Sequence, residues 1–498
     1  MKIQLISSEI TYFERFKTRF IFTALIAGVV FAIECFGANV RQEERPNVVF
    51  ILIDDFGWRD TGVYGSPFYE TPNIDRLAKQ GVRFANAYAA SPVCSPTRAS
   101  IMTGKYPARL RITDWISGNP KSGVLARLLF EQQLPLAEFT IAEAFKEAGY
   151  KTGFIGKWHL GKDDFYPEKQ GFDLNIAGNH RGAPNRSFFS PYNLENLTDG
   201  PDGEYLPDRL ATEAIHFITQ NKDAPFFLFL SHYTVHSPVQ AKPEKIAKYK
   251  NKLALRRIVS KERFVAEGPD ARNREVQDDP EFAAMIESMD ENVGRVLEAL
   301  ETNGLAENTI VVFTSDNGGQ SILLNSYREP WGSNRPLRAG KGWHYEGGIR
   351  VPLIVKWPGK GKMGTTIDTP VISNDFYPTL LEMAGLSLKP EQHLDGKSLA
   401  PLISGATQTL DREALFWHYP HYHGSGHRPS GAVRVGDFKL IEFFEDMRVE
   451  LYDLRRDVSE SNDLSESMPE KTVALRKMLH EWRKNVDAAM PEKAQNKQ

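Results

Sequence analysis

Two pairs of polar residues each close an apolar run of the chain. Asp54-Asp55 follows NVVFILI, and Asp316-Asn317 follows TIVVFTS. A continuously apolar, β-branched run is typical of a buried strand in a parallel sheet. Three carboxylates and one amide oxygen suit Ca²⁺ or Mg²⁺ rather than zinc, which prefers His or Cys. Either pair alone can be a turn or a helix cap, but two pairs at equivalent strand ends favour a metal site.

Four further side chains have types and positions suited to chemistry on an anion. GKWHLG contains Lys157 and His159, VHSP contains His236, and RAGKGWHYEGG contains Lys341. Singly, such a lysine is a solvated charge and such a histidine is structural. Together they would line one cleft with positive charge, which suits a sulfate or phosphate group. Histidine adds proton transfer near neutral pH.

The N-terminal region predicts export. Residues 20–33 form an uncharged apolar run that follows three basic residues and ends at Glu34. This run is shorter than a membrane span of about 20 residues and is typical of a signal-peptide core. We therefore predict a cleaved signal peptide over residues 1–38, a periplasmic or secreted protein, and no stable membrane span after cleavage. The alternatives are an uncleaved anchor and a lipid-modified Cys35, which the neighbouring glutamate disfavours.

The cysteine count raises a question about Cys94. The chain has two cysteines, and signal cleavage would remove Cys35. Cys94 would then lie in an oxidising compartment without a disulfide partner. One interpretation is a buried structural thiol; the other is a chemical role.

The bulk composition is that of a globular protein. With 498 residues, the chain can form one large domain and a smaller one. It is 41% hydrophobic and 25% charged, as ordinary folded domains are. Its formal net charge of −3 lacks the basic excess of nucleic-acid binders, so we expect no nucleic-acid partner.

Apolar runs alternate with amphipathic segments along most of the chain. We expect strands within residues 47–53, 151–161, 224–238, 308–319 and 350–359, and helices within 71–81, 139–150, 281–304 and 373–386. This alternation predicts an α/β fold with a large mixed or mostly parallel sheet sandwiched by helices. Ligands in such folds bind beyond the carboxyl ends of the strands, where the acids, lysines and histidines above fall.

The pattern changes near residue 410. Short strands are expected within 431–454 and a terminal helix within 469–486. We therefore predict a catalytic α/β domain over residues 39–410 and a smaller α+β subdomain over 411–498, with an antiparallel sheet. Residues 239–280 are polar and charged, and we expect an insertion or a surface loop there.

Two segments resemble the signatures of one family. The segment PVCSPTR with the following IMTG (residues 92–104) resembles the first signature of the type I sulfatases, and GYKT through GKWH (residues 149–159) resembles the second. The resemblance extends from about residue 46 to the terminal helix. It implies a fold similar to alkaline phosphatase and the hydrolysis of sulfate esters.

The resemblance also implies what Cys94 does. In this family the cysteine of C-x-P-x-R is oxidised to Cα-formylglycine by a formylglycine-generating or equivalent maturation enzyme. One hydroxyl of the hydrated aldehyde attacks sulfur, and the other expels sulfate by re-forming the aldehyde. One Ca²⁺ ion is implied, and its ligands would be Asp54, Asp55, residue 94, Asp316 and Asn317.

Further roles carry over to matching positions. Arg98 and His159 would hold the hydrated aldehyde, with His159 as a base. Lys157 and Lys341 would bind the sulfate oxygens, and His236 would protonate the leaving oxygen.

The resemblance leaves the substrate to loops over the cleft. We expect a sulfated galactose or N-acetylgalactosamine unit of a polysaccharide. Two segments, AGNHRGAPNRS and the histidine-rich residues 417–431, carry basic and aromatic groups that suit an anionic sugar. The alternatives for the second segment are an ordinary surface loop and a metal-binding tract. The predicted substrate contacts are His180, Arg181, His421, His423, His427 and Arg428.

Two other functions compete with this interpretation. The first is a phosphatase or phosphodiesterase of the same superfamily, which would use Ser or Thr and two metals with several His ligands. The second is a catalytically inactive sulfoglycan-binding protein. The cysteine in C-S-P-T-R argues against the first, and the complete set of implied catalytic positions argues against the second.

Overall fold

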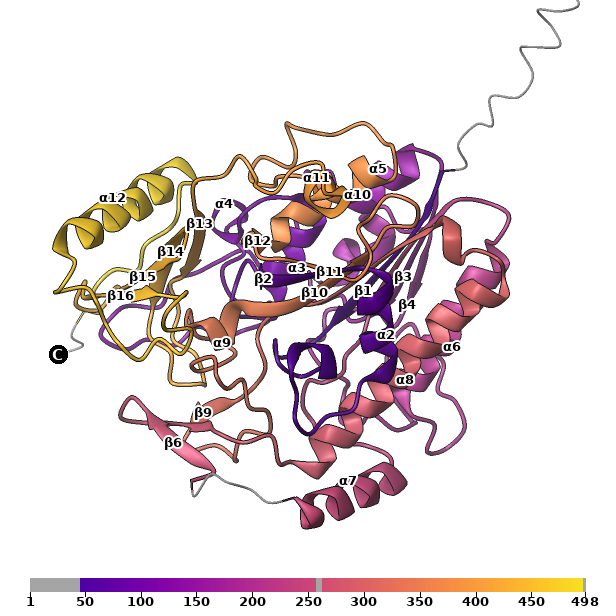
Figure 1. Cartoon of the computed structure of the whole chain (residues 1–498), viewed down its shortest axis with the longest axis horizontal. Helices are drawn as coiled ribbons and strands as arrows, with labels where there is room; N and C mark the ends of the chain where they lie inside the picture. Colours follow the sequence, from indigo (N-terminus) through magenta and orange to yellow (C-terminus); the bar gives the residue numbers. More distant parts are fainter. Residues whose placement is uncertain (1–44, 257–261, 496–498) are drawn as a thin grey trace, which may run out of the picture. The chain divides into compact units, whose positions relative to one another are not determined.

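A mixed sheet of nine strands forms the centre of the protein (Figure 1). The computed structural model describes residues 45–256 and 262–495, so the predicted signal peptide, residues 1–38, lies outside the described residues. Within the described ranges, no helix is long and apolar enough to cross a membrane. The strands in spatial order are β11 (Thr365–Ile367), β2 (Val82–Tyr88), β10 (Arg350–Lys356), β8 (Thr309–Ser315), β1 (Asn47–Ile53), β5 (Phe226–Ser231), β3 (Lys151–Gly156) and β4 (Leu174–Ile176), with β12 (Val371–Ile372) beside β2.

The strands that carry the predicted site residues are parallel neighbours. β1 pairs in parallel with β8 on one side and β5 on the other, and β5 pairs in parallel with β3. β10 runs antiparallel to both β8 and β2, which makes the sheet mixed. The predicted fold class is confirmed.

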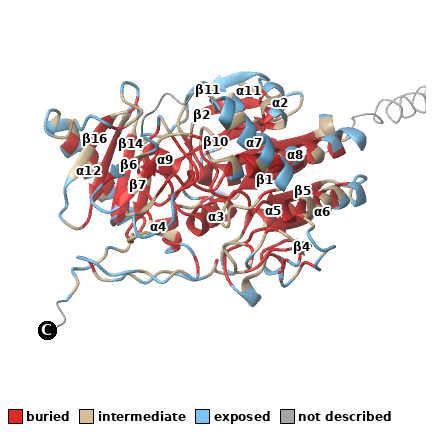
Figure 2. Ribbon diagram, turned by 90° about the horizontal axis from the view of Figure 1, so that it is seen from below, coloured by how far each residue is buried: buried red, intermediate tan, exposed pale blue. Residues whose placement is uncertain are grey.

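Each face of the sheet buries its own apolar layer because side chains alternate along a strand. Val48, Phe50 and Leu52 point to one layer, and Val49, Ile51 and Ile53 point to the other. The buried sheet appears red in Figure 2. One face is covered by α2 (Pro72–Gln80), α6 (Leu206–Gln220) and α8 (Pro280–Thr302), and the other by α3 (Cys94–Thr103), α5 (Ile141–Glu147), α10 (Phe376–Met383) and α11 (Ala400–Ser404).

Local sequence explains where several helices begin. At the start of α5, the Thr140 hydroxyl accepts from the Glu143 backbone N–H, and the Glu143 carboxylate accepts from the Thr140 N–H. This capping box satisfies two N–H groups that the helix cannot pair. Asp279 caps α8 in a similar way, with Pro280 at the first helical position.

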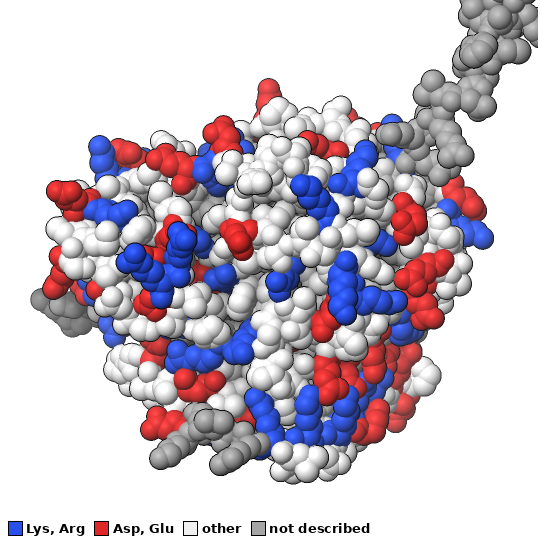
Figure 3. Space-filling view, in the orientation of Figure 1, with Lys and Arg blue, Asp and Glu red and all other residues white. Residues whose placement is uncertain are grey.

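The interpretation of residues 239–280 as a surface loop was wrong. The segment contains α7 (Pro243–Leu255), β6 (Phe264–Glu267) and β7 (Ala271–Arg274), and β6 and β7 form a sheet with β9 (Ile322–Leu324). The segment is polar because α7 packs mainly on one side, against α8, where its lysines pair with glutamates. Acidic and basic side chains intermingle on the face shown in Figure 3.

The C-terminal residues form the predicted antiparallel sheet and helix. The strands β13 (Leu415–Tyr419), β14 (Ser430–Val435), β15 (Phe438–Phe443) and β16 (Val449–Asp453) pair in this order, and α12 (Pro469–Asn485) contacts β14 and β15. The buried Lys439 ammonium joins this sheet to the rest, 2.8 Å from Glu346 and 2.6 Å from Glu460. The boundary at residue 410 stays a prediction.

The remaining elements are short. They are α4 (Pro107–Leu110), α9 (Glu346–Ile349) and the 3₁₀ turns η1 (Gly62–Tyr64), η2 (Asp163–Phe165), η3 (Pro167–Lys169), η4 (Ala306–Asn308) and η5 (Ser373–Asp375).

Phe50 of β1 lies in an apolar layer where its substitution should strongly lower the stability of the protein. The Phe50 ring is fully buried, stacks on Phe229 with 4.8 Å between centroids and meets Phe376 edge-on at 5.3 Å. Phe50→Ala would leave a cavity and should lower the free energy of unfolding by about 3–5 kcal/mol. Urea denaturation measures this change. Leu255→Ala is the control, since Leu255 is 89% exposed; equal effects of both substitutions would contradict the assigned packing.

Candidate active site

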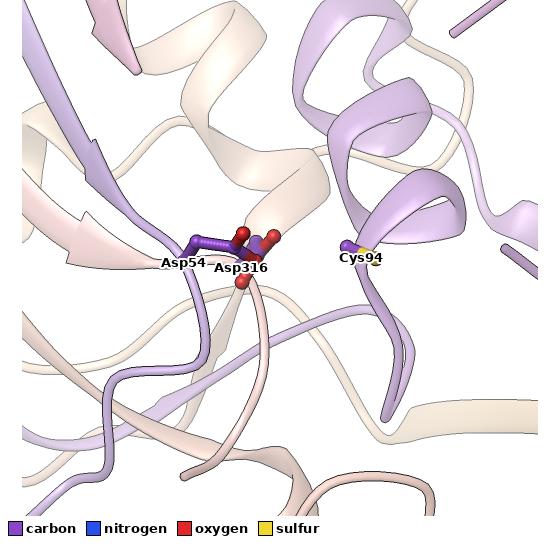
Figure 4. A group of neighbouring side chains, drawn as sticks. All are labelled: Asp54, Cys94 and Asp316. Atoms are coloured by element: carbon purple, nitrogen blue, oxygen red, sulfur yellow. The ribbon is translucent and has the colours of Figure 1, made fainter. Parts of the chain in front are cut away.

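The predicted metal ligands meet because two parallel strands end side by side. Ile53 of β1 lies opposite Ser315 of β8, so the residues that follow them are neighbours. The Asp55 backbone N–H donates to Asp316 Oδ1 over 3.1 Å, and Asn317 Nδ2 donates to Asp55 Oδ1 over 2.8 Å. In Figure 4, Asp54 and Asp316 lie side by side, across from Cys94 at the start of α3.

The oxygen donors of this group fit a hard cation. Ligand atoms of Asp54, Cys94 and Asp316 lie within 4.8 Å of one another. Asp54 Oδ1 and Asn317 Oδ1 are buried and receive no hydrogen bond from the described residues. Because buried oxygens normally have a partner, these two oxygens favour a bound cation. Carboxylate and amide oxygens are the ligands that Ca²⁺ and Mg²⁺ prefer.

Three buried cations balance the three carboxylates. Arg98 Nε donates to Asp316 Oδ2 over 2.9 Å, and Arg98 Nη2 forms an ion pair with the same oxygen at 2.8 Å. Lys157 Nζ lies 2.7 Å from Asp54 Oδ2, and Lys341 Nζ lies 2.7 Å from Asp55 Oδ1. These ion pairs are necessary because an unpaired charge that is buried away from water strongly destabilises the folded protein.

Burial and pairing move the pKa values of these groups in different directions. Burial raises the pKa of Asp54 well above its usual value, because Lys157 offsets the desolvation only in part. Burial acts on Asp55 too, but Lys341 and the other cations hold the pKa of that carboxyl well below its usual range. The same carboxylate raises the pKa of Lys341 against the effect of burial.

Cys94 is the first residue of α3 and is buried. Burial raises the pKa of its thiol, and Lys157 and Lys341 offset this only in part. Because the thiolate is the reactive form of cysteine, an unmodified Cys94 is held in its unreactive form at neutral pH.

His159 shares the cavity wall with Cys94, and one of its ring nitrogens has no hydrogen-bond partner among the described residues. Its Nε2 lies 2.9 Å from the Ile116 carbonyl, and its carbonyl accepts from Ser95 Oγ over 2.9 Å. A carbonyl only accepts, so Nε2 carries the proton and Nδ1 carries the lone pair. Nδ1 is buried without a hydrogen-bond partner among the described residues, and burial lowers the pKa of the ring well below its usual value. The neutral ring can therefore act as a base.

His236 lies beyond the end of β5 and next to Asp55. Its Nε2 lies 3.7 Å from Asp55 Oδ2, and its Nδ1 lies 2.9 Å from the Ser237 carbonyl. Burial and the nearby Lys341 lower the pKa of His236 to about 3. A nearby anion favours the protonated form of such a ring.

A cavity of about 760 Å³ opens above these residues. Cys94, His159, His236 and Lys341 line it, whereas Lys157 and the carboxylate cluster lie beneath its wall. Of the predicted substrate contacts, His180, Arg181 and His423 also line it. The lining residues that the sequence patterns did not indicate include Asp114, Trp115, Lys121, Gln320, Tyr327 and Tyr422.

Three predicted substrate contacts do not line this cavity. His421 Nε2 lies 2.8 Å from Thr113 Oγ1, and the His427 ring lies against Tyr419 with 5.3 Å between centroids. Both are buried, and burial lowers the pKa of His421 to about 3. Arg428 pairs with Glu445 over 3.0 Å and lines a different, smaller cavity.

Comparisons with known proteins agree with this site. Residues 46–386 match the family model Sulfatase, and residues 339–486 match the model "N-sulphoglucosamine sulphohydrolase, C-terminal". The chain is similar to a protein named Sulfatase from Formosa agariphila, with 34% identity over 87% of each chain. It is also similar to N-acetylgalactosamine-6-sulfatase from Rattus norvegicus, with 34% identity over 79% of this chain and 72% of the relative.

A solved structure is similar over most of its length. The crystal structure of Ps i-CgsB in complex with k-i-k-neocarrahexaose has a TM-score of 0.70 and 30% identity, over 88% of this chain and 93% of that one. These matches identify the class of protein as a sulfuric ester hydrolase. The chain belongs to the sulfatase family, as its two signature-like segments predicted.

The role of the Arg98 guanidinium in the carboxylate cluster can be tested by protein stability. Arg98→Ala would leave Asp316 and Asp54 without their shared guanidinium and should lower the free energy of unfolding by about 3–5 kcal/mol. The control is Arg111→Ala, whose partner Asp487 is 85% exposed, with an expected cost of about 0–1 kcal/mol. The stability of both variants is measured by urea denaturation in the presence of a chelator. Similar costs would contradict the central role of Arg98.

Proposed function

We propose that the protein removes sulfate from a sulfated sugar, with residue 94 converted to Cα-formylglycine as the nucleophile. The observation that carries the proposal is the position of Cys94. It lies on the cavity wall, across from Asp54 and Asp316, at the start of a buried helix. Its thiol is held in the neutral form there, whereas a hydrated aldehyde offers a hydroxyl nucleophile at the same place.

We assign one Ca²⁺ ion to the oxygen cluster. Asp54, Asp55, Asp316, Asn317 and residue 94 would hold it. When bound, a divalent cation lowers the pKa of the attacking hydroxyl and neutralises negative charge on sulfate oxygens. The two orphaned oxygens, on Asp54 and Asn317, support this assignment.

The other residues of the site would act on protons and on the sulfate group. His159 Nδ1 accepts the proton of the hydroxyl that expels sulfate, since its Nε2 is held by Ile116. Lys341 binds a sulfate oxygen from the cavity wall, Lys157 beneath the wall adds positive charge next to residue 94, and Arg98 fixes residue 94 against the carboxylates. His236 donates a proton to the leaving oxygen once the anionic ester favours its charged form.

The substrate class rests on the cavity and on the relatives. Arg181, Lys121 and His423 add cationic and polar groups to a cavity large enough for a sugar unit. The similar proteins include one named for N-acetylgalactosamine 6-sulfate and one solved with a carrageenan-type oligosaccharide. We therefore propose a sulfated galactose or N-acetylgalactosamine unit of a polysaccharide, acted on outside the cytoplasm after export.

The nucleophile can be tested by mass spectrometry of the tryptic peptide of residues 84–98. In protein from a cell with the maturation enzyme, we expect the mass of an aldehyde in place of the thiol, and reaction with hydrazides. Cys94→Ala should lower turnover roughly 10⁴-fold or more and leave the circular dichroism spectrum unchanged. An active protein with unmodified Cys94, or turnover in the variant, would contradict the proposed nucleophile.

The metal can be tested by stability as well as by activity. Ca²⁺ at about 100 times its dissociation constant should raise the free energy of unfolding by about 2.7 kcal/mol over the chelated protein. Asn317→Ala removes one oxygen ligand and should reduce this increase. Asn462→Ala, an exposed residue, should not. The proposal fails if Ca²⁺ has no effect on unfolding, or the same effect in Asn317→Ala.

A further inference from the structure

One carboxylate lies in a cavity that is otherwise cationic. Asp114 is the only acidic residue among the described residues that line it, and the other charged side chains there are Lys121, Arg181 and Lys341. A carboxylate repels a sulfate ester, so its presence needs a physical reason. The proposed chemistry gives Asp114 no role.

The loop that carries Asp114 is fixed beside the nucleophile. The Ile116 backbone N–H donates to Ser95 Oγ over 2.9 Å, and the Ile116 carbonyl lies 2.9 Å from His159 Nε2. Ser95 follows Cys94 directly, and His159 lines the same cavity as Cys94. Ser95 and His159 therefore hold this loop next to residue 94. Asp114 is two residues from that anchor, and its place relative to residue 94 is therefore defined.

The Asp114 carboxyl is itself held in one orientation. Its Oδ1 accepts from the Tyr419 hydroxyl over 2.7 Å and from the Trp115 backbone N–H over 2.9 Å. Its Oδ2 receives no hydrogen bond from the described residues. The residue is 3% exposed, and because it lines the cavity, that exposure faces the ligand space. Burial raises the pKa of Asp114 to about 7, which weakens repulsion of an anion.

An aromatic ring lies next to this carboxyl. Trp115 lines the cavity and is 39% exposed. A Cβ atom at Gly118 would come within 3.0 Å of the indole Cε2, so the ring lies directly over the Gly118 backbone. A flat apolar face beside a fixed hydrogen-bonding group matches a sugar ring, which has an apolar C–H face and hydroxyls at its edge.

We propose that Asp114 and Trp115 form a sugar subsite, in which Asp114 Oδ2 hydrogen-bonds a hydroxyl of the sulfated sugar and the Trp115 ring packs against its face. The proposal rests on the proposed function and deepens it. A sulfate ester whose alcohol has no hydroxyls cannot make the hydrogen bond to Asp114, although an aromatic ring can still pack on Trp115. Asp114 therefore selects sugar sulfates over aryl sulfates without taking part in sulfate transfer.

The test compares two substrates in one series of variants. Galactose 6-sulfate and N-acetylgalactosamine 6-sulfate are the sugar probes, and 4-nitrophenyl sulfate is the probe without hydroxyls. Asp114→Asn should lower kcat/KM roughly 10- to 100-fold for the sugar sulfate that the wild type cleaves, and less than about threefold for the aryl sulfate. The control is Glu131→Gln, an exposed carboxylate of the same loop region that does not line the cavity.

Trp115→Ala tests the subsite independently, and circular dichroism checks that this variant, which loses a side chain at a 39% exposed position, keeps its fold. It should raise KM for the sugar sulfate, and also for the aryl sulfate to the extent that the nitrophenyl ring packs on the indole. Equal losses on both substrates in Asp114→Asn would overturn the subsite and assign Asp114 a structural role, and so would an unchanged KM for the sugar sulfate in Trp115→Ala. A wild type that cleaves the aryl sulfate but neither sugar sulfate would also overturn it, whereas a converted wild type that cleaves no sulfate ester contradicts the proposed function itself.

Discussion

Charge balance at the ends of β1 and β8 is the constraint on which the rest of the structure depends. Three carboxylates, Asp54, Asp55 and Asp316, are buried where water cannot solvate them. Each is paired with a cation that comes from a distant part of the chain: Lys157, Lys341 or Arg98. The pairs tie α3, β3 and the loop before α9 to the central strands. On the proposed function, a divalent cation and a sulfate ester, with charges of +2 and −1, would together change the buried charge by only +1.

The same constraint makes the site rigid. Asp55 and His159 both have φ near 60°, in the left-handed region that residues with a side chain rarely adopt. Their backbones are fixed by hydrogen bonds to Asp316 and Asn179. All ten residues of α3 are buried, so the reactive position cannot shift with a surface loop. Groups held in this way need little rearrangement when charge develops on sulfate.

The sequence predicted the strands well and the loops poorly, for physical reasons. NVVFILI and TIVVFTS are apolar on both faces, and only a strand covered by helices on both sides requires this. The signature around Cys94 is long and specific. By contrast, residues 239–280 are polar because α7 packs mainly on one side, against α8, which composition alone does not distinguish from a loop.

In the histidine-rich residues 417–431, composition alone also does not show which side chains reach the active-site cavity. Composition suggested one role for His421, His423 and His427, but only His423 lines the main cavity. His421 and His427 pack against Tyr419, the last residue of a strand that the sequence patterns did not reveal. Asp114 was also not indicated, because a single acid before a tryptophan has no periodic pattern. Its position depends on Ser95 and Tyr419, which are distant in sequence.

The burial of α3 has a consequence for any cell that makes this enzyme. On the proposed chemistry, a modifying enzyme would need access to an extended segment around Cys94, and the folded protein offers none. Conversion and folding would then compete, and the outcome for each molecule would be final once α3 has packed. On the proposed chemistry, a preparation is then a mixture of fully active and inert molecules with the same fold. Its specific activity reports the ratio of two rates in the producing cell, and later addition of metal or substrate does not change that ratio.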